Sequence, residues 1–359
     1  MNNKSVRASV SRANELPIKN LLKRLKKVGF KEPFIRASVL PDWWDDELSR
    51  NPSGMAIAEV SITRHLNIPI AAMRSKDAPL IPAFEGDYRL KKIKTTNVDE
   101  LLPAIGIAQS VAESLDACEM DLGEPTFADL SASEIRQQIL QTRESVDLEG
   151  LLAWAWAHGI IVAHINLPTG IKKFTGIALY VSDRPVILLG STKDSPPWLS
   201  FHLAHELGHL LLSHVRPGHP ILDVEMGFQA NEFIDTPEQL QEEDAANRFA
   251  LEILTGDPDI SARPVYGLTG PKLATYAREV EKTRQINAGT VALIYGHGAG
   301  RMPVAQIALN KLDLSSGGIQ IITRSVAHFL PETLPESVAS VLRLIGIEQD
   351  KARCLLPAY

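Results

Sequence analysis

The chain has 359 residues, of which 45% are hydrophobic and 22% are charged, and its formal net charge is -6. This length exceeds what one ordinary core accommodates, and the composition is that of a soluble globular protein, so two or three folded domains are expected rather than disorder. The acidic balance argues against wholesale binding of nucleic acid.

Membrane insertion and secretion are not expected from this sequence. No apolar run approaches the roughly 18 residues that cross a bilayer, and Lys19, Lys23 and Arg24 interrupt the N-terminus where a signal peptide would be continuous. A cytoplasmic location is therefore predicted. Cys118 and Cys354 lie far apart and lack metal-binding spacing, which indicates neither a disulfide framework nor a cysteine zinc site.

The N-terminal segment from Met1 to Lys31 is basic, with nine Lys or Arg residues against the single acid Glu15. Two interpretations stay open. The segment contacts the phosphates of DNA, or its charges form the solvated face of an amphipathic helix from Ile18 to Val28.

Helices are predicted over most of the first third of the chain. Asp42, just before the paired tryptophans, is a candidate cap for a short helix in an acidic patch, and helical periodicity from Met55 to Met73 breaks at Asn67-Ile68-Pro69. The run His65–Pro69 is similar to the junction before the last helix of a repressor-type helix-turn-helix domain. A further helix is expected from Val98 to Leu122, interrupted at Pro103.

The hydrophobic period changes near the middle of the chain. Ser131 and Glu134 form a capping-box pattern, and a helix is predicted from Leu148 to His158. Three runs rich in β-branched residues then predict strands over 160–165, 177–181 and 185–189, the last two joined as a hairpin. A peptide can bind in extended form along an open edge of such a sheet, although the sequence does not show which strand is the edge.

The following helix carries the pattern His-Glu-x-x-His, with His205, Glu206 and His209. Side chains four residues apart lie on the same face of a helix, so the two imidazoles can bind one zinc ion while Glu206 faces its open side. Ser195 is a candidate N-cap, and prolines suited to a first turn follow it. The alternative interpretation is an amphipathic core helix with two partly buried histidines.

A catalytic zinc usually has three protein ligands, and a downstream helix offers the third. Thr236, Pro237 and Gln239 predict its start, and Gly256 predicts its end. Of its three consecutive acids, Glu243 shares a face with small residues that allow close helix contact, whereas Asp244 shares a face with Arg248, as in a solvent-exposed pair.

Glu243 is therefore the predicted third ligand. Asn247, one turn further along the helix, is the predicted hydrogen-bond partner of a ligand histidine. The alternative for the three acids is a charged surface turn near the start of a helix.

These two motifs together, His205–His209 after Phe201 and Glu243–Ala250, resemble the ImmA/IrrE family of zinc metallopeptidases, over about Leu148 to Asp257. The resemblance implies Zn²⁺ held by His205, His209 and Glu243, with Glu206 acting on water. His202 and Ala245 depart from residues common in the family, and neither position is a proposed ligand. The family frequently carries a repressor-like DNA-binding domain, which connects it with the His65–Pro69 run.

The remaining third of the chain is predicted to be mainly helical. Helices are expected over 271–286, 289–295, 303–312 and 332–345, with a short strand over 319–323. The predicted fold class is α+β, mainly helical, with a central zincin-like metallopeptidase domain in which a small sheet packs on the His205 helix and a second ligand-bearing helix. The predicted domains are 1–125, 126–260 and 261–359.

Two hypotheses follow for function. In the first, the protein is a regulatory protease that cuts a specific cytoplasmic protein, such as a repressor or an antitoxin-like partner, in stress, mobile-element or phage-defence regulation. In the second, it is a DNA- or protein-binding regulator with a structural or inactive zinc site. Four residues are unranked candidates for stabilising an oxyanion: Tyr180, His202, His214 and His219.

Overall fold

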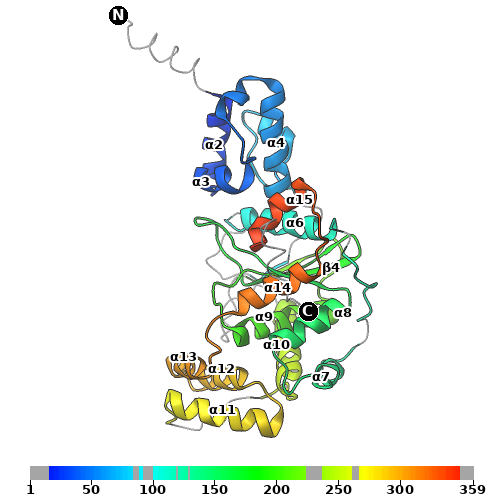
Figure 1. The fold of residues 1–359 in the computed structure, drawn as a ribbon, viewed down its shortest axis with the longest axis vertical. Coiled ribbons are helices and arrows are strands. Elements are labelled where there is room, and N and C mark those ends of the chain that lie inside the picture. The colour runs from blue at the N-terminus through cyan, green and yellow to red at the C-terminus, as the bar shows by residue number, and fades with distance from the viewer. Residues whose placement is uncertain are drawn as a thin grey trace, which may run out of the picture.

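The computed structural model shows an elongated molecule in three tiers (Figure 1). A small helical lobe lies at one end, a five-stranded sheet with its covering helices lies in the middle, and a group of three helices lies at the other end. This mainly helical α+β architecture confirms the predicted fold class. The structure describes residues 16–83, 89–91, 100–118, 120–127, 130–223, 237–260 and 267–347.

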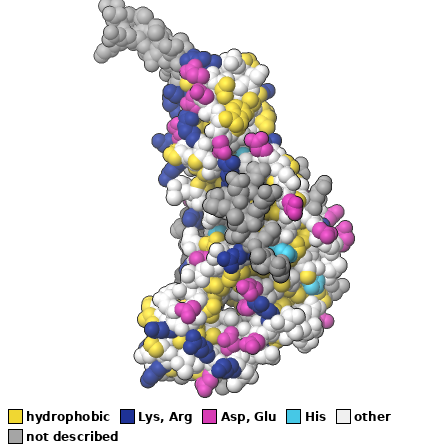
Figure 2. Space-filling model, in the orientation of Figure 1, with side chains coloured by type: hydrophobic (Ala, Val, Ile, Leu, Met, Phe, Trp, Pro, Cys, Tyr) yellow, Lys and Arg dark blue, Asp and Glu magenta, His cyan; other side chains and the backbone are white. Residues whose placement is uncertain are grey.

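The N-terminal lobe is built on α2 (Pro17–Lys27) and α4 (Pro52–Leu66), with α3 (Glu32–Phe34), η1 (Ile35–Val39) and η2 (Asp46–Arg50) between them. Helix α2 confirms the amphipathic prediction, because its leucine and isoleucine face is buried and its lysines are exposed. The basic residues before Leu16 lie outside the described residues. Figure 2 shows charged side chains on one side of this lobe and hydrophobic ones on the other.

Two local predictions in this lobe can be compared with the structure. Asn67 adopts a left-handed conformation with φ of 54° and ends α4, and α5 (Ile70–Arg74) follows, as the broken periodicity predicted. The prediction that Asp42 caps the short acidic helix is wrong. Asp45 accepts the capping hydrogen bond from the Glu47 amide instead, while Asp42 forms an ion pair with Arg343 at 2.9 Å.

Helix α6 (Leu102–Asp116) corrects a second prediction. Pro103 lies in the first turn of α6, where the missing amide hydrogen costs no intrahelical bond, and α6 ends before the predicted Leu122, while the predicted start at Val98 lies outside the described residues. The next two helices match expectation. Ser131 and Glu134 form both bonds of a capping box at the start of α7 (Ala132–Leu140), and α8 (Leu148–Ala157) ends just before Gly159.

The sheet has the order β1-β5-β3-β4-β2. The three predicted strands are present as β2 (Ile161–His164), β3 (Gly176–Val181) and β4 (Arg184–Leu189), and β3 and β4 form the predicted antiparallel hairpin. β2 runs parallel to β4, and β5 (Ile221–Asp223) pairs antiparallel with the other side of β3. β5 and the outer strand β1 (Arg89–Lys91) were not predicted.

Helix α9 (Pro196–Leu211) packs against β3 and β4, and α10 (Pro237–Thr255) packs along it. Ser195 precedes α9, but its hydroxyl donates to the Leu314 carbonyl at 2.7 Å rather than capping the helix. Gly256, with φ of 81°, ends α10 as predicted, whereas the Thr236 cap lies outside the described residues.

The C-terminal third contains α11 (Gly270–Arg284), α12 (Ala288–Gly298), α13 (Met302–Lys311), α14 (Gly318–Phe329), α15 (Glu336–Leu342) and η5 (Arg343–Ile345). The strand predicted over 319–323 is wrong. Its β-branched run lies inside α14, where Ile322 and Val326 point into the core four residues apart. The last predicted helix begins later than expected, at Glu336.

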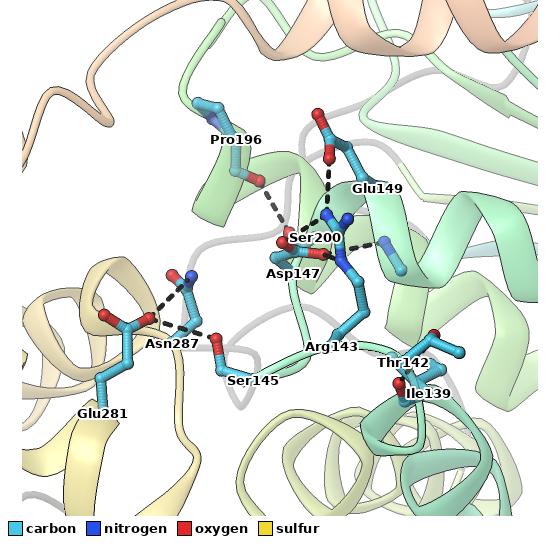
Figure 3. A network of polar contacts seen from close by, with 11 residues as sticks. Ile139, Thr142, Arg143, Ser145, Asp147, Glu149, Pro196, Ser200, Glu281 and Asn287 are labelled. Carbon is cyan, nitrogen blue, oxygen red and sulfur yellow. Dashed lines mark hydrogen bonds and ion pairs between the residues drawn. The ribbon is translucent and has the colours of Figure 1, made fainter.

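The core is continuous from the N-terminal lobe through the sheet to α14 and α15, while α11, α12 and α13 share smaller clusters of their own. Polar contacts join α11 to the segment between α7 and α8 and to the start of α12. Glu281 of α11 accepts hydrogen bonds from Ser145 at 3.1 Å and Asn287 at 3.4 Å (Figure 3). The three-domain division stays a prediction. Within the described ranges, no helix has both the length and the hydropathy needed to cross a bilayer.

Candidate metal centre

The centre begins with two histidines on one face of α9. His205 and His209 are completely buried, and their Nε2 atoms lie 3.0 Å apart. An α-helix places residues four apart one above the other, which brings the two rings together without any contribution from a loop. The spacing of the motif thus brings the two imidazole rings together, as the sequence predicted.

Helix α10 brings Glu243 to the same point. Its carboxylate oxygens lie 3.5 Å from His205 Nε2 and 3.4 Å from His209 Nε2. Zinc bound tetrahedrally by ligands at about 2 Å holds neighbouring ligand atoms about 3.3 Å apart. The observed separations fit that geometry, and two imidazoles with one carboxylate are a common zinc donor set, so these three residues could hold a metal ion.

The two helices can approach closely because small residues lie between them. A side-chain carbon at Gly208 would lie 3.1 Å from the backbone of Ala246, tighter than ordinary contact. Ala246 and Ala250, on the predicted contact face of α10, are completely buried. Glycine in the motif is therefore part of what lets Glu243 reach the histidines.

The neighbouring acid of the predicted pair points elsewhere. Asp244 is exposed, whereas Glu243 is only 5% exposed. Arg248 is also exposed, but it forms its ion pair with Asp259 rather than with Asp244. The prediction that Glu243 and not Asp244 faces α9 agrees with this geometry, and the predicted Asp244–Arg248 pair is replaced by a pair across the end of the helix.

Each histidine is oriented through its outer ring nitrogen. His205 Nδ1 lies 3.0 Å from Asn247 Oδ1, and His209 Nδ1 lies 3.1 Å from His214 Nδ1. A histidine that binds metal through Nε2 carries its proton on Nδ1, so both contacts are donations away from the metal position. Asn247 therefore occupies the position predicted for it.

His214 can accept such a bond because it is held neutral. Burial, followed by the nearby His209, lowers the pKa of His214 to about 4. A neutral imidazole has one free lone pair, which the Nδ1 hydrogen of His209 can use. His214, one of the four oxyanion candidates, thus turns its Nδ1 toward the outer side of a proposed ligand.

Glu243 is held in its ionised form. Burial alone would raise the pKa of this carboxyl, but the hydrogen bonds and charge of His205 and His209 outweigh that effect and lower the pKa well below its usual range. A carboxylate must be ionised and an imidazole must be neutral to bind a metal ion, so metal binding would displace the Nε2 protons that lower this pKa.

Glu206 lies on α9 between the two histidines in sequence and is completely buried. Its carboxylate contacts the first residue of β3, where a side chain on Gly176 would overlap it. Gly176 was not singled out from the sequence, although a glycine within a strand pattern signals the close approach of another group. The hairpin strand thus leaves the space in which Glu206 lies.

The other three oxyanion candidates lie in different surroundings. His202 is buried one turn before Glu206, with its ring 6.0 Å from that of Trp198. Tyr180 is half-buried on β3, and burial raises its pKa. His219 is exposed in the turn that it closes with Arg216.

Comparison with known families identifies the segment that carries this centre. Residues 157–281 match the Peptidase_M78 model, described as the IrrE N-terminal-like domain. The match contains α9, α10 and the whole sheet except β1, and it covers about a third of the chain. No curated protein and no solved structure matches the chain. The resemblance to the ImmA/IrrE metallopeptidases is thereby confirmed for this segment.

Proposed function

We propose that this IrrE N-terminal-like domain is a zinc-dependent protease that hydrolyses a peptide bond in a specific protein substrate. The observation that carries the proposal is the buried arrangement of His205, His209 and Glu243 with a further carboxylate, Glu206, against Gly176. A purely structural zinc site needs no such base, whereas hydrolysis does.

In this proposal each of these residues has a separate role. His205, His209 and Glu243 hold Zn²⁺, which supplies Lewis-acid activation of water and of the scissile carbonyl. Glu206 accepts the proton of the attacking water and returns it to the leaving amine. Asn247 and His214 fix the ring planes of the two histidines through the outer nitrogens, so the ligand atoms stay aligned.

The substrate we propose is a cytoplasmic regulatory protein, either a transcriptional repressor or an antitoxin-like partner. Its cleavage would act in stress, mobile-element or phage-defence regulation. Support comes from the match to the IrrE N-terminal-like domain and from the helical N-terminal lobe of this chain, since the resemblance to the ImmA/IrrE family implies a repressor-like domain beside the peptidase domain.

A second candidate function is a DNA- or protein-binding regulator whose metal site is structural. The observation in its favour is the exposed lysine face of α2, with Lys19, Lys23, Lys26 and Lys27. If this face binds duplex DNA through phosphates, affinity falls steeply as salt rises. Binding that does not weaken with salt would contradict the electrostatic role.

The deciding experiment compares wild type with Glu206→Gln, and uses Glu238→Gln, on the exposed first turn of α10, as the matched control. Zinc content is measured by elemental analysis, and new protein N-termini are mapped by mass spectrometry in cells expressing each form. We expect all three proteins to bind zinc and Glu206→Gln alone to lose the new termini. If Glu206→Gln keeps both zinc and the same cleavage pattern, hydrolysis through Glu206 is excluded.

A further inference from the structure

A cavity of about 690 Å³ lies between α8 and α14. The two helices lie side by side (Figure 1), and the segment Asp121–Gly123 completes the cavity wall. None of the proposed zinc ligands lines it, and of its lining only Ala157 belongs to the matched residues 157–281. Sites for small molecules typically have volumes of roughly 300–1,000 Å³, so this cavity is large enough for a ligand of its own.

Short side chains on α8 keep the cavity open. Ala153 and Ala157 lie one turn apart on this helix, and both line the cavity and are exposed to solvent. Trp156 of α8 stacks on Phe329 of α14, with ring centroids 4.5 Å apart and ring planes inclined by 13°. Leu152 adds a buried aliphatic side chain to the same wall. The cavity therefore offers apolar, partly aromatic walls to a flat molecule.

Trp156 also contributes an unsatisfied donor to this wall. Its side chain is 2% exposed, and within the described ranges its indole N–H has no hydrogen-bond acceptor. A buried indole N–H usually has a partner, because leaving such a donor unpaired is costly. A ligand that brings an oxygen atom into this cavity can supply the missing acceptor.

The polar groups of the cavity favour an anionic ligand. Arg324 and His328 lie one turn apart on α14 and both line the cavity, and among the described residues Arg324 has no ion pair. The acid that α8 contributes, Glu149, is already paired with Arg143 at 2.5 Å. The second acid of the lining, Asp121, is exposed and does not belong to either helix. The positive charge of Arg324 is thus available on α14, and a group with several anionic oxygens is its complement.

We propose that the cavity between α8 and α14 is a binding site for a small organic acid with a flat apolar body. The apolar body lies against the walls formed by Leu152, Trp156 and Phe329, and the carboxylate lies at Arg324 and His328. This site is separate from the zinc chemistry proposed above, so it stands or falls independently of the protease.

The test uses two naphthalene probes that differ in charge. Anilinonaphthalene sulfonate carries an anionic group, whereas phenylnaphthylamine has a similar ring system without one. Both fluoresce more strongly in an apolar site, so a Kd can be measured for each by titration of the full-length protein. Naphthoate, itself a flat organic acid, should displace the sulfonate probe from wild type.

Two kinds of variant separate the charge from the cavity. Arg324→Gln should weaken the sulfonate probe by about tenfold or more and leave the neutral probe unchanged. The matched control is Arg301→Gln, at an exposed position before α13, which should change neither Kd. Ala153→Trp fills the cavity from its solvent side and should abolish binding of both probes, and Ala157→Trp is a second variant of the same kind.

Each alternative outcome has a defined meaning. Equal affinity of the sulfonate probe for wild type and Arg324→Gln overturns the anion site. Both probes binding normally to folded Ala153→Trp and Ala157→Trp, with circular dichroism as the check on folding, would place them elsewhere on the protein and overturn the cavity as the site. Failure of naphthoate to displace the sulfonate probe overturns the assignment to organic acids. All these measurements are made without zinc, so none of them bears on the proposed hydrolysis.

Discussion

Helix α9 packs against several helices, and its contacts with α10 and with α12 are built on opposite principles. Toward α10 it presents His205 and His209, both completely buried. Toward α12 it presents Trp198, which belongs to an apolar cluster with residues of α11, α12 and α13. One helix thus carries the candidate metal centre at one end and an ordinary hydrophobic contact at the other.

Both contacts use glycine to bring backbones close, yet for different reasons. Gly208 of α9 faces Ala246 of α10, and Gly289 of α12 faces Pro197 of α9. The first approach sets the distance between ionisable groups, while the second only fills space. A buried charge is costly unless it is paired, so the α10 contact depends on atomic positions in a way that the α12 contact does not.

The largest effect should come from removing the carboxylate that completes the α10 contact. Glu243→Ala leaves two buried imidazoles with no anionic partner, and we expect zinc affinity to fall by on the order of a thousandfold. Asp244→Ala, at the exposed neighbouring position, should leave zinc affinity unchanged. Competition with a chromogenic chelator measures both, and the reverse pattern would show that the ligand assignment is wrong.

A side chain at Gly208 tests whether the helix spacing itself matters. Gly208→Val pushes against the Ala246 backbone and should cost about 1–3 kcal/mol of unfolding free energy together with zinc affinity. Gly289→Val, which meets the ring of Pro197, should cost comparable stability and leave zinc affinity intact. Thermal unfolding and zinc titration of both variants decide the matter. Equal loss of zinc affinity in both would contradict the distinction drawn between the two contacts.

A smaller effect is expected one step away from the metal position. Asn247→Ala removes the acceptor 3.0 Å from His205 Nδ1, and such orienting partners typically account for about 10–100-fold in metal affinity. Asn247→Asp keeps an acceptor and should retain most of the affinity. Zinc competition titrations compare the three proteins, and an alanine variant with wild-type affinity would mean that Asn247 does not orient the ring.

The same contrast explains what the sequence could predict. The candidate site could be predicted from the sequence because helical spacing alone places His205 above His209. It also helped that Glu243 and Asp244 lie on different faces of their helix. β5 could not be predicted from the sequence, because three residues are too few to show an alternating hydrophobic pattern. Its pairing also depends on where α9 has placed the chain. In α14, Ile319, Ile321 and Ile322 suggested a strand through their β-branched side chains, but burial against the sheet decided in favour of a helix.

The smallest predicted effect concerns a histidine buried without a carboxylate. His65 of α4 is 1% exposed, and its Nδ1 lies 2.8 Å from the Ser61 carbonyl. Burial lowers the pKa of His65 below its usual 6.5 despite this bond, so the folded protein keeps the ring neutral. Below about pH 6.5 the unfolded chain takes up a proton at His65 that the folded chain does not. The free energy of unfolding therefore decreases as the pH is lowered.

Replacing His65 by glutamine, which keeps a side-chain donor, should remove this part of the pH dependence. Between pH 7.5 and 5.5 we expect His65→Gln to lose less unfolding free energy than wild type, by at most about 1.4 kcal/mol for each unit by which the pKa differs between folded and unfolded chains. Urea unfolding at the two pH values, followed by tryptophan fluorescence, measures the difference. An identical pH dependence in both proteins would mean that His65 is protonated in the fold and that burial alone does not keep a histidine neutral here.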